Sequence, residues 1–224
     1  QRDLSVVVQP RFADWRIIQT EALGIGEVEI MPDGKMRVAF RLWDTATEQE
    51  KLLSGQRGRQ YVTTGENLRR VAHVLADDIY SSLTGDEGYF DTRIVFIAES
   101  GPKTERRKRL AIMDQDGANA EFLTDGRYTV LTPRFSPTDQ TITYMTYENG
   151  RPQVYLFDIE TGRSESLGRF EGMTYAPRFS TDGESVLFSQ AANGNSDVYI
   201  MELVSRNKTR LTDHPAIDTS PSMS

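Results

Sequence analysis

Few side chains in this sequence are of the kinds that carry out catalysis or bind metal ions. The chain has no cysteine and only two histidines, His73 and His214, far apart along the sequence. Neither histidine has a second histidine or a cysteine at the spacing of metal ligands, and a single histidine on a helix is usually a surface or partly buried side chain. The sequence therefore predicts no metal ion and no cofactor.

Two short strings resemble known sites without matching them. Gly162-Arg163-Ser164-Glu165-Ser166 lacks the closing glycine of the Gly-x-Ser-x-Gly elbow that presents a nucleophilic serine. Asp114-Gln115-Asp116-Gly117 looks like the start of a calcium loop, but the acidic residues that follow are not at EF-hand spacing. Both strings fit turns between short strands better, so we expect that the chain is not an enzyme.

The charge balance limits the kinds of partner. The 224 residues include 26 Lys and Arg against 33 Asp and Glu, which gives a formal net charge of −7. Such a chain has no general electrostatic attraction for nucleic acid or anionic lipid. No apolar run is long enough to be a transmembrane segment, and the first residues, Gln1-Arg2-Asp3-Leu4, lack the profile of a signal peptide. The protein is therefore either cytosolic or missing its targeting segment.

A repeat of 44 residues organises the second half of the chain. Pro133-Arg134-Phe135-Ser136 recurs as Pro177-Arg178-Phe179-Ser180 and, in degenerate form, as Pro221-Ser222-Met223-Ser224. An apolar string that ends in an acidic residue has the same spacing, at 110–114, 154–158 and 198–202. A fixed period of this length is typical of solenoids and propellers.

Each repeat is predicted to form four short antiparallel strands. In the middle repeat the strands are 131–135, 141–147, 153–158 and 164–167, and turn-forming residues such as Glu148-Asn149-Gly150 separate them. This arrangement indicates a β-propeller. The first repeat has a longer loop between its second and third strands, 99–109, which carries Arg106-Arg107-Lys108-Arg109. Such a basic run is usually only solvated, and the alternative is a contact site for an acidic partner.

Residues 92–224 are therefore expected to form part of a β-propeller. About three repeats are present, whereas a propeller closes with roughly 4 to 8 blades, so we expect the sequence to be a fragment. The segments just before each Pro-x-Phe-Ser string, 128–132, 172–176 and 213–220, are predicted loops that gather on one face around the channel. They are the expected partner-binding surface. The alternative is that they are scaffold turns without a ligand.

Residues 1–88 have a mixed α/β pattern, which makes the predicted fold class α+β. A helix is predicted over 12–22, where Phe12, Trp15, Ile18 and Ala22 have helical spacing. Strands are predicted over 25–30, 35–43 and 59–62, and the second has the alternation of a strand with one buried face.

A second helix is predicted to begin at a capping box formed by Thr63 and Glu66 and to continue to about Leu83. Gly85 is the expected stop. The stretch 84–91, rich in glycine and acidic residues, is the predicted linker into the first blade.

Several of these strings resemble the TolB family. The blade strings Thr132–Pro137, Val154–Asp158 and Ala176–Gly183 resemble its propeller repeat, which other proteins also carry, including some serine peptidases. The upstream strings Ala22–Ile25 and Val38–Thr45, with the junction from Leu83 to Phe96, resemble its N-terminal domain. In that family an α/β domain precedes a six-bladed propeller, and the resemblance covers essentially the whole chain.

The resemblance implies a non-catalytic periplasmic protein of the Tol-Pal envelope system, whose propeller binds the peptidoglycan-associated lipoprotein Pal. Aligning the motifs puts the Pal-contacting positions near Met173, Ala176 and Thr219. The predicted partner-binding residues are Met173, Thr174, Tyr175, Ala176, Thr219, His214, Thr129 and Leu131. The family's N-terminal segment that contacts TolA has no counterpart in this sequence, so binding of TolA is not expected.

Two other functions stay open at this level. One is the propeller part of a serine peptidase whose catalytic domain lies beyond Ser224. The other is a sugar-binding propeller, which is less favoured because the loops offer chiefly Tyr128 and Tyr175 as aromatic residues.

Overall fold

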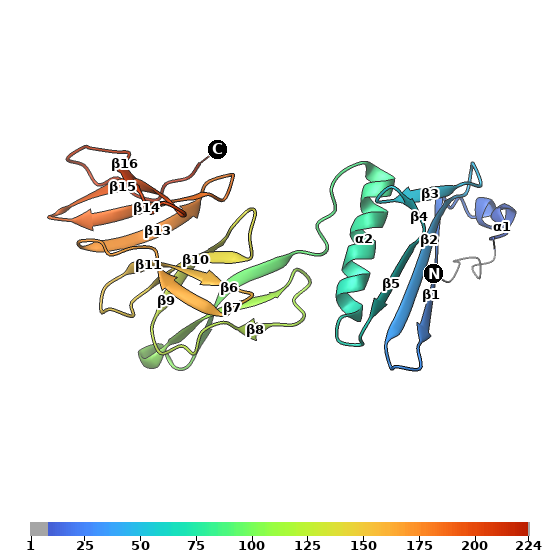
Figure 1. Ribbon diagram of the computed structural model, residues 1–224, viewed down its shortest axis with the longest axis horizontal. Coiled ribbons are helices and arrows are strands. Elements are labelled where there is room, and N and C mark those ends of the chain that lie inside the picture. Colours follow the sequence, from blue (N-terminus) through green and yellow to red (C-terminus); the bar gives the residue numbers. More distant parts are fainter. Residues whose placement is uncertain (1–8, 224) are drawn as a thin grey trace. The chain divides into compact units, whose positions relative to one another are not determined.

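The computed structural model describes residues 9–223 and divides the chain into two compact units, Gln1–Thr92 and Arg93–Ser224 (Figure 1). The start Gln1-Arg2-Asp3-Leu4 and the final Ser224 of the last repeat string lie outside the described residues. No helix within 9–223 is long and apolar enough to cross a bilayer. The fold class is α+β, as the sequence predicts.

The first unit is built on one antiparallel sheet around a central strand. That strand, β2 (Met36–Asp44), pairs along its whole length with β1 (Ala22–Ile30). Its other edge pairs first with β5 (Arg59–Thr63) and then with β3 (Glu50–Leu53), which forms a small hairpin with β4 (Gln56–Arg57). The three predicted strands are confirmed, and the hairpin of β3 and β4 was not predicted because each of its strands is too short to show a period.

The prediction of one buried face for β2 is incomplete. Val38 and Leu42 are buried on the predicted face, but Ala39 and Trp43 are buried on the other. Trp43 packs edge-on against Phe12, with the ring centroids 5.6 Å apart. Phe12 of the first helix therefore covers Trp43 on the second face, which a strict apolar alternation cannot indicate.

The first helix, α1 (Phe12–Ile17), is shorter than predicted. The backbone turns at Gln19, whose φ is 58°, and the chain from Ala22 onward pairs with β2. The carbonyl oxygen of Glu21 accepts the backbone N–H of Thr45 at 3.0 Å, which holds the connection against the sheet. Sheet pairing thus overrides the helical spacing of the apolar residues.

The second helix, α2 (Leu68–Thr84), is confirmed and ends as predicted, but it begins several residues later than predicted and its predicted capping box is wrong. Thr63 is the last residue of β5, and Asn67 stands at the N-cap. The predicted stop is confirmed: Gly85 has a φ of 82° and its N–H bonds the carbonyl oxygen of Ser81.

A buried carboxylate joins α2 to the sheet. Asp78 is only 7% exposed, and it pairs with Arg59 at 2.9 Å while the hydroxyls of Ser54 and Tyr61 donate to it. Burial is the largest influence on Tyr61 and raises the pKa of its hydroxyl. The charge of Asp78 is thus matched by one cation and two neutral donors.

The second unit consists of three successive antiparallel sheets (Figure 1). The strands are β6 (Arg93–Ser100), β7 (Arg107–Asp114) and β8 (Glu121–Phe122), then β9 (Val130–Phe135), β10 (Thr141–Thr146), β11 (Gln153–Asp158) and β12 (Arg163–Ser166), then β13 (Met173–Phe179), β14 (Ser185–Ala192), β15 (Asn195–Glu202) and β16 (Lys208–Arg210). The four-stranded blade is confirmed for the second and third sheets, whereas the first has three strands within the described chain.

Apolar side chains fill the two spaces between neighbouring blades. Leu110, Ile142 and Phe157 belong to the core between the first and second sheets. Val154, Phe188 and Met201 belong to the core between the second and third. Each blade is therefore stabilised by its neighbours, as stacked repeats require.

The basic run of the first blade does not lie on a long loop. Arg107, Lys108 and Arg109 are part of β7, and a short 3₁₀ turn, Lys103–Glu105, precedes them. Lys108 pairs with Glu99 of β6 at 2.8 Å, and the guanidinium of Arg109 lies 3.5 Å from the ring centroid of Phe122. The predicted long loop over 99–109 is therefore wrong, because residues 107–109 pair with β6 and extend the β6–β7 ladder.

Candidate partner-binding face

The segments predicted as loops before the Pro-x-Phe-Ser strings are in part strand. Residues 130–132 belong to β9 and residues 173–176 to β13, so these two loops are shorter than predicted. Both strands contain a bulge directly before their proline, where the register with the next strand shifts. The proline has no N–H to give to a ladder, and a bulge accommodates that lack.

One residue in each repeat has the left-handed conformation directly before the proline, within the bulges of β9 and β13 and in the segment before Pro221. Thr132, Ala176 and Ser220 have φ values of 50°, 52° and 59°, and they are 44 residues apart. Residues other than glycine rarely adopt this conformation, which costs about 1–2 kcal/mol. The propeller thus repeats one strained position at the same place in successive blades.

The predicted binding residues differ in exposure. Met173 is 42% exposed, and Thr129, His214 and Thr219 are exposed as well. Leu131, Tyr175 and Ala176 are half-buried. These seven side chains stay a predicted surface.

Thr174 belongs to the joint between two blades. Its side chain is 1% exposed, and its hydroxyl oxygen accepts the backbone N–H of Val154 at 2.9 Å. Its own N–H donates to the carbonyl oxygen of Pro152 at 3.0 Å. We therefore leave Thr174 out of the surface that a partner could touch.

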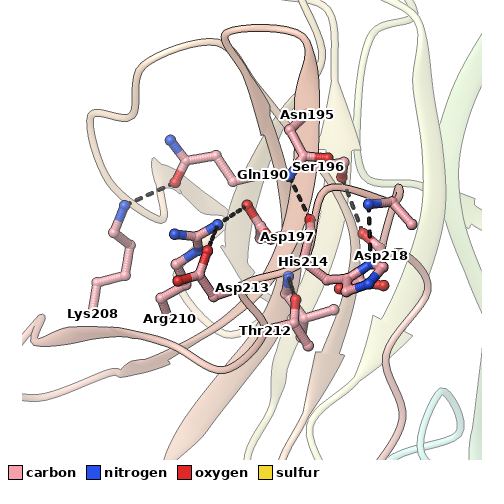
Figure 2. A network of polar contacts seen from close by, with 12 residues as sticks. Gln190, Asn195, Ser196, Asp197, Lys208, Arg210, Thr212, Asp213, His214 and Asp218 are labelled. Atoms are coloured by element: carbon pink, nitrogen blue, oxygen red, sulfur yellow. Dashed lines mark hydrogen bonds and ion pairs between the residues drawn. The ribbon is translucent and has the colours of Figure 1, made fainter.

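The segment Asp213–Ser220 is tied to β15 by a row of polar contacts (Figure 2). Asn195 donates to the carbonyl oxygen of His214 at 2.8 Å, and the hydroxyl of Ser196 donates to that of Asp218 at 3.1 Å. The N–H of Asp218 in turn bonds the Ser196 carbonyl at 2.8 Å. These contacts hold the backbone and leave the side chains of His214 and Thr219 exposed.

A charged cluster lies beside this segment (Figure 2). Arg210 pairs with Asp197 at 2.7 Å and with Asp213 at 2.8 Å. Burial alone would lower the pKa of Arg210, but the hydrogen bond and the charge of Asp197 outweigh it and raise that pKa. The sequence does not mark this cluster, because the 44-residue register puts Gln153 and Ser166 at the positions of Asp197 and Arg210.

A pocket of ≈ 480 Å³ opens next to the cluster. Lys208 lies in it with its ammonium 4.4 Å from the ring centroid of Tyr199 and donates to Gln190 at 2.8 Å. Burial lowers the pKa of Lys208. Residues 169–171, which lead into the third blade, close one side of the pocket.

The strings that resemble catalytic or metal sites have structural partners. Ser164 lies on β12, and its hydroxyl is 2.9 Å from that of Tyr144, whose pKa is raised chiefly by burial. Asp114 ends β7, and its N–H bonds the carbonyl oxygen of Ala118 across a tight turn. No group of three or more acidic or histidine side chains within residues 9–223 is arranged to hold a metal ion.

A mixed α+β unit followed by stacked four-stranded blades is the architecture of a propeller protein with an accessory N-terminal domain. A family model described as the TolB beta propeller domain matches residues 80–224, and one described as the TolB amino-terminal domain matches residues 1–51. The chain belongs to the TolB family.

A solved structure supports the same family. The crystal structure of TolB from Acinetobacter baumannii is 31% identical, with a TM-score of 0.80, over 94% of this chain and 51% of that one. The chain thus spans about half the length of that protein. Putative TolB from Agrobacterium tumefaciens is 15% identical, with a TM-score of 0.49, over 92% of this chain and 67% of that one. An acylaminoacyl peptidase from Pyrococcus horikoshii is 11% identical, with a TM-score of 0.41, over 53% of this chain and 23% of that one. Both are distant matches.

Proposed function

We propose that this chain is a non-catalytic, periplasmic protein-binding part of the Tol-Pal system, and that the channel face of its propeller binds the lipoprotein Pal. Membership of the TolB family supports the system and the compartment. In this proposal residues 1–88 are the N-terminal α/β domain and residues 92–224 the propeller part. Binding of TolA is not part of it.

The observation that supports the face is the left-handed residue that recurs before each of the three prolines. Thr132 and Ala176 hold a left-handed backbone within β9 and β13, and Ser220 holds the same conformation before Pro221. Exposed Met173 and Thr219 lie near two of these positions in the sequence. Backbone strain that recurs in this way is often kept where a surface must have one shape for a ligand. The fixed polar contacts of Ser196 to Asp218 preorganise the third copy of this surface.

The test is a binding titration between the full-length protein and the soluble domain of Pal. Thr219→Lys places a charge on the proposed surface and should weaken binding at least roughly tenfold, since burying an unpaired charge in an interface is costly. Thr181→Lys is the matched control, because Thr181 is an exposed threonine in the turn after β13, at the other end of that strand. Its affinity should equal that of the unchanged protein.

Two results would contradict the proposal. One is the absence of Pal binding by a folded protein. The other is an equal loss of affinity in the two lysine variants, which would show an effect of charge without a particular face.

A further inference from the structure

Two arginines stand at the same position in neighbouring blades. Arg134 is on β9 and Arg178 on β13, 44 residues apart. Each strand is the first of its sheet and pairs on one side only, and the two strands contact each other. The free edge of a first strand faces the central channel of a propeller, so both residues belong to the channel wall.

Both side chains are held in the same way. Arg134 donates from Nη1 to the carbonyl oxygen of Pro133 at 2.8 Å, and Arg178 donates from Nη1 to that of Pro177 at 2.9 Å. Each proline lies where the register with the next strand shifts. One bond fixes each guanidinium and leaves most of its N–H donors unused.

The positive charges of this pair are not balanced within the described chain. No ion pair found among residues 9–223 includes either arginine. Burial lowers the pKa of Arg178, and the charge of Arg134 lowers it further, so the two guanidinium groups repel each other. Two like charges that repel each other are stabilised when an anion lies between them.

We propose that Arg134 and Arg178 form a subsite on the channel wall that binds the carboxylate side chains of an acidic peptide segment. A guanidinium matches a carboxylate with two parallel hydrogen bonds, and two fixed guanidinium groups select a segment with successive acidic residues. Arg178 lies two residues beyond Ala176, roughly 6–7 Å further along β13. The subsite is local to these two blades, since the third repeat has Ser222 at this position.

The subsite does not depend on Pal as the partner and is tested without it. The probe is a fluorescein-labelled hexaglutamate peptide, titrated by anisotropy against the full-length protein at low salt, with hexaglutamine as the uncharged peptide. We expect hexaglutamate to bind and hexaglutamine not to bind. Arg134→Gln and Arg178→Gln should each reduce the affinity roughly tenfold, as expected for the loss of a charge-assisted hydrogen bond.

The matched control is Arg163→Gln, which removes one charge from exposed Arg163 on the outer strand β12 and should leave the affinity unchanged. If a glutamine variant does not fold, Arg178→Lys keeps the charge without the fork and should still bind hexaglutamate, but more weakly than the unchanged protein. Inorganic phosphate as competitor separates a general anion site from a peptide site, and full displacement at low millimolar phosphate would overturn the assignment to peptide.

Equal binding of the two peptides, or equal losses in Arg178→Gln and Arg163→Gln, would also overturn it. Failure of the Pal titration would not affect the outcome of the hexaglutamate titration, and failure of the hexaglutamate titration would not affect the proposal of Pal binding.

Discussion

Replacing Thr174 with valine removes one hydroxyl from the joint between the second and third blades. That hydroxyl accepts the N–H of Val154 at 2.9 Å, and neither residue is open to water, with Thr174 1% and Val154 0% exposed. Valine has almost the same shape as threonine, so packing is retained while the backbone donor loses its partner. We expect the substitution to destabilise the propeller.

The magnitude follows from the fate of the Val154 N–H. A buried donor left without an acceptor costs about 1–3 kcal/mol, because water cannot take the place of the lost oxygen. Thr143 provides the opposite case, because it is 0% exposed and its hydroxyl has no hydrogen-bond partner among residues 9–223. Thr143→Val should therefore be neutral or should stabilise the protein by up to about 1 kcal/mol.

The two variants are compared by urea unfolding of this chain. Trp15 and Trp43, the only tryptophans, lie in the first unit, so their fluorescence reports that unit. The β-sheet signal in circular dichroism comes from both units, but most of the strands belong to the propeller blades, so this signal reports chiefly the blades in the same titration. Thr174→Val should shift the dichroism transition to lower urea and leave the fluorescence transition in place.

Equal midpoints for Thr174→Val and Thr143→Val would refute this reasoning, because the variants differ only in whether the lost hydroxyl had a partner. A shift of the fluorescence transition alone would also refute it, since Thr174 has no contact with the first unit among the hydrogen bonds described.

Two further predictions concern carboxylates. Asp78→Ala leaves half-buried Arg59 without its counter-ion and should destabilise the first unit by about 3 kcal/mol. The measurement is the urea midpoint of the tryptophan fluorescence, and an unchanged midpoint would contradict this prediction. The backbone N–H of Thr161 is the largest influence that holds the pKa of Asp158 below its usual value of 3.8. The ionised carboxylate of Asp158 therefore stabilises the fold above pH 3.8, and this stabilisation is lost as the pH falls through the folded-state pKa. Asp158→Asn should therefore unfold with a smaller difference between pH 5 and pH 3 than the unchanged protein, and an equal difference would contradict it.

The sequence predicts the elements whose signals are local or repeated. The strands of the middle blade agree with prediction within one or two residues, because turn-forming residues such as Asn149 and Gly150 fix where each strand ends. The end of α2 is predicted for the same reason, since Gly85 readily adopts a positive φ.

The errors lie where pairing across the fold decides the conformation. Ala22 has helical spacing with Phe12, but its backbone pairs with Asp44 of β2. Thr63 has the spacing of a capping box, but it ends β5 opposite Met36. A local pattern cannot weigh a ladder partner that is distant in the sequence.

The propeller repeat and the family can be predicted from residue types alone, because the 44-residue period and the recurring Pro-x-Phe-Ser strings are visible without any structure. The folded structure is needed to tell which of two neighbouring side chains is exposed and which joins two blades. Thr174 and Met173 are adjacent in the chain, yet one is buried between blades and the other is exposed. Successive side chains of a strand point to opposite faces, and the position of the neighbouring blade determines which face is covered.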